Sequence, residues 1–141
     1  MKRLLLLLIG ATTAVALSSC TKTELVENTS NRSYVYTIVQ NQWQWDNGVT
    51  YQVYYDKAIP ALTDYYLLEG SVSVAISFDD EASYDILPTT FNGVAYSVNY
   101  TVGNVTIYAE DPLADSEIEV PLPENAVVKV ILSDADFAGE L

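Results

Sequence analysis

The sequence predicts an all-β fold: a single antiparallel two-sheet β-sandwich of about seven strands. Apolar and polar residues alternate with period two in several short segments, most clearly from Ser71 to Phe78. The chain is rich in β-branched residues and contains 11 tyrosines, and both kinds of residue favour strands. Turn dipeptides such as Asn47-Gly48 and Gly103-Asn104 separate these segments. Several short strands divided by turns are typical of a sandwich.

The first half of the predicted domain contains a hairpin and one short helical turn. Alternation predicts strands at 34–40 and 50–56, with 42–46 as an extension of the first, and Asn47-Gly48 is the expected hairpin turn. At 63–69 the pattern changes. Thr63 or Asp64 can cap a helical turn, which Gly70 can terminate.

The second half repeats the strand pattern and supplies most of the expected core. Strands are predicted at 71–78, 84–87, 94–102, 105–109 and 126–132. The acidic segment 110–125 contains three prolines and is expected to be a long connection. Alternation predicts that Val74, Ile76, Val98 and Ile107 are buried and that Ser71, Ser73 and Ser77 face solvent. Adjacent Val127 and Val128 suggest a strand that is covered on both faces.

The N-terminus has the pattern of an export signal. Met-Lys-Arg precedes an apolar run that ends in Leu17-Ser18-Ser19-Cys20. The run from Leu4 to Leu17 is too short for a transmembrane helix, which needs roughly 20 apolar residues. A secreted protein with a free Cys20 is the alternative, although an unpaired thiol at the cleavage site is unusual in an oxidising compartment.

The segment Leu17 to Cys20 resembles the lipobox of bacterial lipoproteins. This resemblance implies that residues 1–19 are removed as a signal peptide and that Cys20 is lipidated and becomes the N-terminus. Residues 20–33 are then a polar tether that spans about 20 Å if flexible, and 34–137 form the β-sandwich domain. Thr21 replaces the aspartate that retains enteric lipoproteins at the inner membrane, which favours the outer membrane.

The charge of the expected mature chain excludes several partners. It keeps four basic residues and all 19 acidic residues, a net charge of −15. Such a surface repels the phosphates of nucleic acids and anionic lipid headgroups. We therefore expect no nucleic-acid partner, and we expect membrane contact only through lipid on Cys20.

The order of several short motifs resembles a group of small lipoproteins of Bacteroidetes-type bacteria. The resemblance covers roughly Tyr34 to Leu132. The motifs include Gln42-Trp43-Gln44-Trp45, Leu87-Pro88, and Val127-Val128-Lys129 near the end. In that group the first part of the last strand often carries an aromatic and a basic residue, and here Asn125-Ala126 stand there instead. The resemblance implies a compact β-sandwich and provides no catalytic residue.

The residue types present leave little catalytic chemistry. The chain has no histidine, and its single cysteine is the expected lipid site, so histidine-based nucleophilic sites are excluded. Carboxylate pairs could hydrolyse glycosides, but the acidic clusters fall in turn-like segments of a small sandwich. We therefore expect a protein that is not an enzyme. Calcium, which prefers six to eight oxygen ligands, is the alternative use of Asp79, Asp80 and Asp85.

Aromatic residues are the remaining means of recognition. Trp43 and Trp45 share a face if their segment is extended, and exposed rings could stack on sugars. They could equally fill the core. A bulge at Gln44, with Trp43 in the core and Trp45 outside, is the expected arrangement. Three functions stay open: a structural or protein-interaction module, a carbohydrate-binding accessory lipoprotein, and a fimbrial or assembly subunit that uses strand addition at 71–78 or 126–132.

Overall fold

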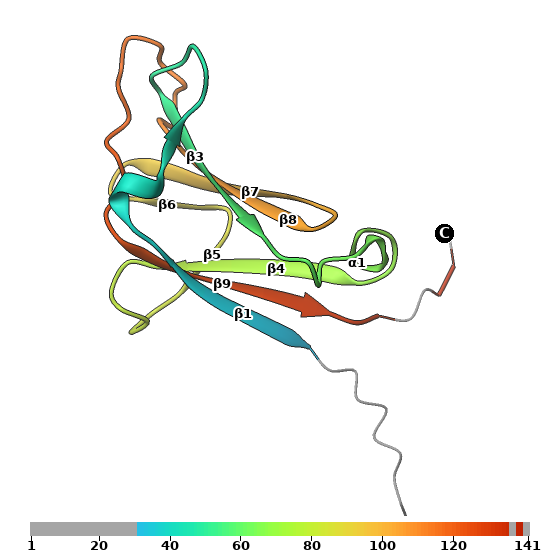
Figure 1. Cartoon of the computed structure of the whole chain (residues 1–141). Coiled ribbons are helices and arrows are strands. Elements are labelled where there is room, and N and C mark those ends of the chain that lie inside the picture. Colours follow the sequence, from blue (N-terminus) through green and yellow to red (C-terminus); the bar gives the residue numbers. More distant parts are fainter. Residues whose placement is uncertain (1–30, 136–137, 140–141) are drawn as a thin grey trace, which may run out of the picture.

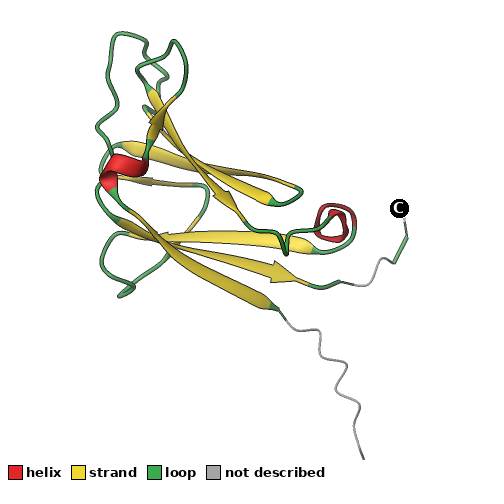
Figure 2. Cartoon of the chain, viewed as in Figure 1, coloured by secondary structure: helices red, strands yellow, loops and turns green. Residues whose placement is uncertain are grey.

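The protein folds into two antiparallel β-sheets that pack face to face. The computed structural model describes residues 31–135 and 138–139. One sheet has the strand order β1-β9-β4-β5 and the other the order β2-β3-β8-β7-β6 (Figures 1 and 2). We call them sheet A and sheet B. The predicted all-β, two-sheet sandwich is confirmed.

Nine strands and two short helices make up the described part of the chain. The helices are η1, a 3-10 turn (Gln40–Gln42), and α1 (Asp64–Leu68). The strands are β1 (Arg32–Ile38), β2 (Gln44–Trp45), β3 (Gln52–Ala58), β4 (Ser71–Ser77), β5 (Asp85–Ile86), β6 (Thr89–Phe91), β7 (Val94–Thr101), β8 (Asn104–Glu110) and β9 (Ala126–Ser133).

The observed elements differ from the predicted ones in two places. The expected extension of the first strand is broken by η1, where the backbone N–H of Val39 donates to Gln42 Oε1 at 3.0 Å. The unpredicted strand β6 pairs with β7 through a turn at Asn92 and Gly93, whose φ angles are 49° and 79°. Asn-Gly is the same dipeptide that predicted a hairpin at Asn47-Gly48, so the sequence carried a local signal for this turn as well.

The core lies between the two sheets and is built by alternation along each strand. In β9, every second side chain is buried from Ala126 to Leu132, and β8 shows the same pattern around Val105, Ile107 and Ala109. Val74, Ile76 and Ile107 are buried as predicted. Val127 is only half-buried, so β9 is covered fully on one face and not on both.

Two predicted core assignments were wrong. Val98 is half-buried because burial declines along β7, from Val94 to Thr101. Ser77 is 2% exposed although alternation placed it outside. Its hydroxyl donates to Asp79 Oδ1 at 2.8 Å and accepts the backbone N–H of Glu81 at 2.9 Å. The turn after β4 therefore folds over this serine and buries it.

The short helix forms where the sequence predicted it. The backbone N–H groups of Glu69 and Gly70 both bond to the carbonyl of Tyr65 and so end α1. A Cβ atom at Gly70 would lie 2.8 Å from the carbonyl oxygen of Ser133 and from the Tyr66 ring. Glycine is therefore required here by the close approach of these two groups.

The sandwich has two distinct ends. At the α1 end, β1 begins at Arg32, which is paired with Leu132, and the Tyr65 hydroxyl donates to the Ala135 carbonyl at 2.8 Å. At the opposite end, which we call the loop end, lie η1, the β2–β3 connection and residues 111–125 (Figure 1). The chain thus enters the sandwich at the α1 end and presents its longest connections at the other.

Candidate functional site

The predicted lipidation residue, Cys20, and residues 20–30 of the predicted tether lie outside the described residues. Among the helices that the structure describes, none has the length and apolar character needed to cross a membrane.

Trp43 lies in the core, as predicted. Its side chain is 5% exposed and packs edge-on against Tyr55, with ring centroids 6.4 Å apart. Tyr55 in turn stacks on Tyr36 at 6.0 Å. Within the described residues, the indole Nε1 of Trp43 and the hydroxyl of Tyr36 are buried without hydrogen-bond partners. Trp43 therefore packs the end of the core and offers no exposed face to a ligand.

Trp45 is exposed, as predicted, but for a different reason. It pairs with Val53, which is fully buried, so the indole lies on the interior face of sheet B. The bulge predicted at Gln44 is wrong, because Gln44 and Trp45 pair in regular register with Tyr54 and Val53. The ring is 38% exposed because β2 is an edge strand only two residues long, at the margin of the sandwich.

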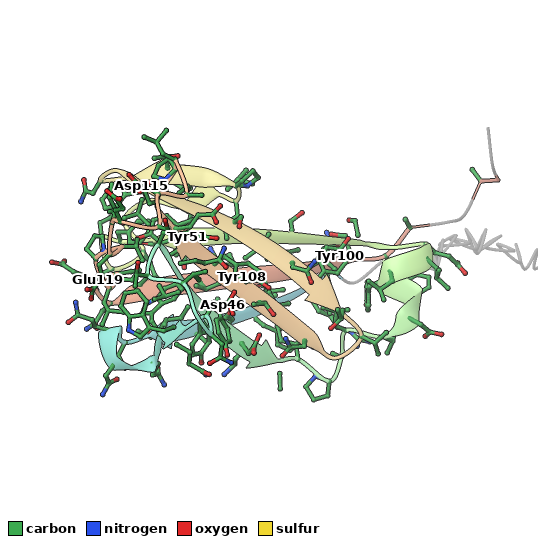
Figure 3. All side chains as sticks on the ribbon, turned by 90° about the horizontal axis from the view of Figure 1, so that it is seen from above. Asp46, Tyr51, Tyr100, Tyr108, Asp115 and Glu119 are labelled. Carbon is green, nitrogen blue, oxygen red and sulfur yellow. The ribbon has the colours of Figure 1, made fainter. Side chains whose placement is uncertain are left out.

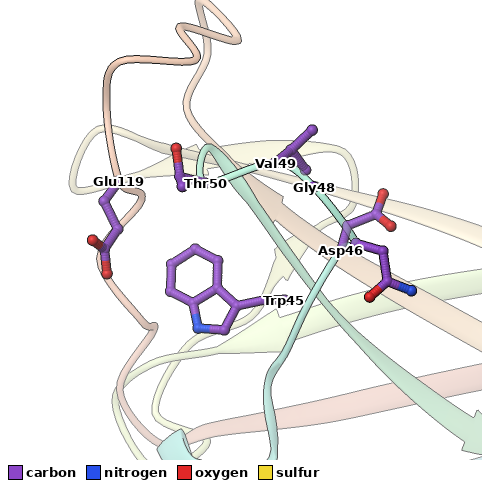
Figure 4. A pocket seen from close by; sticks show the side chains of 7 residues that line it. Trp45, Asp46, Gly48, Val49, Thr50 and Glu119 are labelled. Carbon is purple, nitrogen blue, oxygen red and sulfur yellow. The ribbon is translucent and has the colours of Figure 1, made fainter.

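A hollow of about 490 Å³ surrounds Trp45. Its walls come from the β2–β3 connection and from Glu119 on the facing loop (Figure 4). Thr50 fixes this loop. Its hydroxyl contacts the carbonyls of Ser116 and Ile118 at 3.2 and 3.1 Å, and its carbonyl accepts the N–H of Val120 at 2.9 Å. The loop end is thereby tied together around an exposed indole.

The expected calcium ligands are not brought together. Both carboxylate oxygens of Asp79 are engaged by Ser77 and Ser83, at 2.6 to 2.9 Å. The Ser83 bonds lower the pKa of Asp79. Asp80 sits at the turn with φ 53°, and Asp85 is on β5 opposite Ile76. Within residues 31–135 and 138–139, no three His, Cys, Asp or Glu side chains are placed to hold a metal ion.

Aspartates of the acidic segment 110–125 also support turns. Asp111 Oδ1 accepts the backbone N–H of Leu113 at 3.0 Å, and Asp115 Oδ1 accepts that of Glu117 at 2.9 Å. These are side-chain caps of local turns, a common use of aspartate.

The sequence did not reveal an aromatic pair on the outer face of sheet B. Tyr54 and Tyr108 are partners across β3 and β8, with ring centroids 6.4 Å apart. They line a hollow of about 310 Å³ together with Asp46, Asp56 and Thr106. Tyr108 and Asp46 are labelled in Figure 3, which looks onto this side of the molecule. Alternation around Val53 and Ala109 could have shown that both tyrosines face outward, but only the register shows that they meet.

No family model, curated protein or solved structure matches the chain. What the protein does therefore has to be inferred from the sequence and the geometry.

Proposed function

We propose that the protein is a non-enzymatic, lipid-anchored interaction module of the bacterial cell envelope. The observation that carries this proposal is the position of the chain entry. β1 begins at the α1 end, so a tether from Cys20 would join the domain there and leave the loop end, with Trp45 and Glu119, free to meet a partner. A domain that is tethered at one end and carries its loops at the other suits binding to a partner in front of the membrane.

The sequence features support the same proposal. The lipobox-like segment Leu17 to Cys20 implies permanent anchoring, because two or more acyl chains at one residue hold a protein far more firmly than the single chain that binds reversibly. Thr21 favours the outer membrane, and the resemblance to small Bacteroidetes-type lipoproteins fits this placement. The short tether would keep the sandwich close to the membrane surface.

Metabolic labelling with an alkyne fatty acid tests the anchor. The wild-type chain should be labelled and should sediment with membranes, whereas Cys20→Ser should be unlabelled and be released or remain an uncleaved precursor. Thr21→Ser is the matched control and should behave like the wild type. Label on the Cys20→Ser chain, or a wild-type chain in the soluble fraction, would contradict the proposal.

Strand addition is the second candidate function, and the strand order favours β1 as the edge that would carry it. β9 lies between β1 and β4 and has no free edge, so 126–132 cannot accept a strand, and β4 is already paired with β5 at Ala75 and Ile76. The long free edge in sheet A is β1. Val35 is 50% exposed there, and a hollow of about 320 Å³ lies between this strand and Lys57 to Pro60.

Assembly through β1 predicts a concentration-dependent oligomer. Light scattering across a wide concentration range should then show that Val35→Lys is monomeric, because a lysine on an edge strand opposes pairing. Val35→Thr should retain the oligomer. A wild-type chain that stays monomeric at every concentration would remove self-assembly as the role of this edge.

A further inference from the structure

Tyr54 and Tyr108 form an aromatic surface on the outer face of sheet B. The residues that precede Tyr54 and follow Tyr108, Val53 and Ala109, are fully buried, so both tyrosines point away from the core. Their rings are tilted by 45°, and both side chains are half-buried. Because the two residues are Cα partners on long strands, the surface is held by the sheet and not by a loop.

Polar side chains border this aromatic surface on both sides. Asp46, whose N–H bonds to the Gln52 carbonyl, lies on one side, and Asp56 and Thr106, which are Cα partners, lie on the other. All three line the same hollow as the two tyrosines. The site therefore combines two ring faces with two carboxylates and one hydroxyl.

Hydrogen bonds within the protein hold Asp56, Thr106 and the Tyr54 hydroxyl in place. Asp56 Oδ1 accepts hydrogen bonds from Thr106 Oγ1 at 2.6 Å and from Asn104 Nδ2 at 3.3 Å. The Tyr54 hydroxyl donates to Gln44 Oε1 at 3.2 Å. In the part of the chain that the structure describes, Asp56 Oδ2 and the Asp46 carboxylate have no hydrogen-bond partner. Because both aspartates are exposed, these oxygens can accept hydrogen bonds from the hydroxyl groups of a ligand in exchange for water.

We propose that this surface, which we call the Tyr54–Tyr108 platform, binds a neutral glycan. A sugar ring has an apolar C–H face that packs on an aromatic ring, and hydroxyl groups at its rim that donate to carboxylates. A few convergent polar groups around an aromatic surface are typical of small-ligand sites, and about 310 Å³ is at the small end of their range. The platform therefore fits one end or a short stretch of a glycan chain.

The charge of the platform selects against acidic glycans. The basic residues of the described chain are Arg32, Lys57 and Lys129, and none of them lines this hollow. Uronate or sulfate groups would meet Asp46 and Asp56 and be repelled. The inference rests on the proposed interaction-module function and names the ligand class of that module.

A glycan array probed with the mature chain, carrying both neutral and acidic polysaccharides, tests the inference. Neutral glycans should bind and acidic ones should not. Tyr108→Ala should weaken the binding at least tenfold, whereas Tyr108→Phe should retain it, because the ring and not the hydroxyl makes the surface. Asp56→Asn should weaken binding as well. Ile86→Ala is the control, because Ile86 is exposed on β5 of the other sheet, and it should bind like the wild type. Trp45→Ala tests the loop end as the alternative site of the ligand.

Three results would overturn the inference. One is an array with no neutral glycan bound, and another is binding confined to acidic polymers. The third is a folded Tyr108→Ala chain that binds like the wild type. Loss of binding in Trp45→Ala alone would be one form of this result and would place the ligand at the loop end. Folding is checked by the thermal midpoint. If Tyr108→Ala does not fold, Asp56→Asn supplies the second reading, because Asp56 is exposed, and unchanged binding of that chain would overturn the inference. If no glycan binds and the chain is labelled by the fatty acid, glycan binding is refuted and the proposal of a lipid-anchored interaction module is retained.

Discussion

Truncation of Ile76 tests the face assignment on which the whole sandwich depends. Ile76 is fully buried at the centre of sheet A, between Val128 on β9 and Asp85 on β5 in the register. Ile76→Ala removes three carbon groups, which are worth about 2.4 kcal/mol at about 0.8 kcal/mol each. The cavity that remains raises the expected loss to about 3–4 kcal/mol, within the range measured for such changes.

This loss is a large part of the stability of one domain, which is about 5–15 kcal/mol. It should lower the thermal midpoint by about 10–25 °C, which calorimetry or far-UV circular dichroism can measure. Ser73→Ala is the matched control, because Ser73 lies on the same strand and is exposed, so its midpoint should stay within a few degrees. An unmoved midpoint for Ile76→Ala, or an equal loss for Ser73→Ala, would refute the face assignment.

Three further outcomes follow from the structure. Single-tryptophan chains should differ in acrylamide quenching, with the indole of Trp43 shielded in Trp45→Phe and that of Trp45 accessible in Trp43→Phe; equal quenching would contradict the placement. Millimolar calcium should leave the thermal midpoint unchanged relative to chelator, because the Asp79 carboxylate is already engaged, and a rise specific to calcium would restore the metal hypothesis. Gly70→Ala should lower the midpoint, because its Cβ would press on the Ser133 carbonyl, and an unchanged midpoint would contradict that close approach.

The parts of the fold that follow from local patterns were predictable. Period-two alternation placed β4, β8 and β9 and identified Val74, Ile76 and Ile107 as buried, because successive side chains of a strand point to opposite faces. Gly70 ended the helical turn for a local reason as well. The prediction that Ser77 is exposed was wrong because the turn that follows β4 covers its side chain. Alternation within a strand carries no information about that contact.

The candidate site depends on strand order, which the sequence pattern does not contain. Trp45 is exposed because β2 is a short edge strand, and that is a property of the sheet order. Tyr54 and Tyr108 meet because β3 pairs with β8 in one register, and a slip of one residue would turn Tyr108 into the core. The sequence pattern can therefore indicate which residue types are available for a site, but not which of them lie next to one another in the folded sheet.

Alkaline titration provides a test of packing that does not depend on any ligand. Burial raises the pKa of Tyr96 to about 12, and the hydrogen bond to Glu81 raises that of Tyr84 to about 12, from the model-compound value of 10.0. Both shifts favour the neutral phenol in the folded state. Their contribution to stability is therefore fully present below pH 10, where the unfolded chain is also neutral, and is lost as the pH rises toward 12.

Absorbance at 295 nm should then show two phases while circular dichroism still reports a folded chain. Tyr84 and Tyr96 should ionise in the later phase, near pH 12. Glu81→Gln should move Tyr84 back toward the early phase and leave Tyr96 in the late one, because only Tyr84 donates to Glu81, at 2.6 Å. A single early phase in the folded wild type would show that Tyr96 is not enclosed between the sheets, and would contradict the packing of sheet B on sheet A.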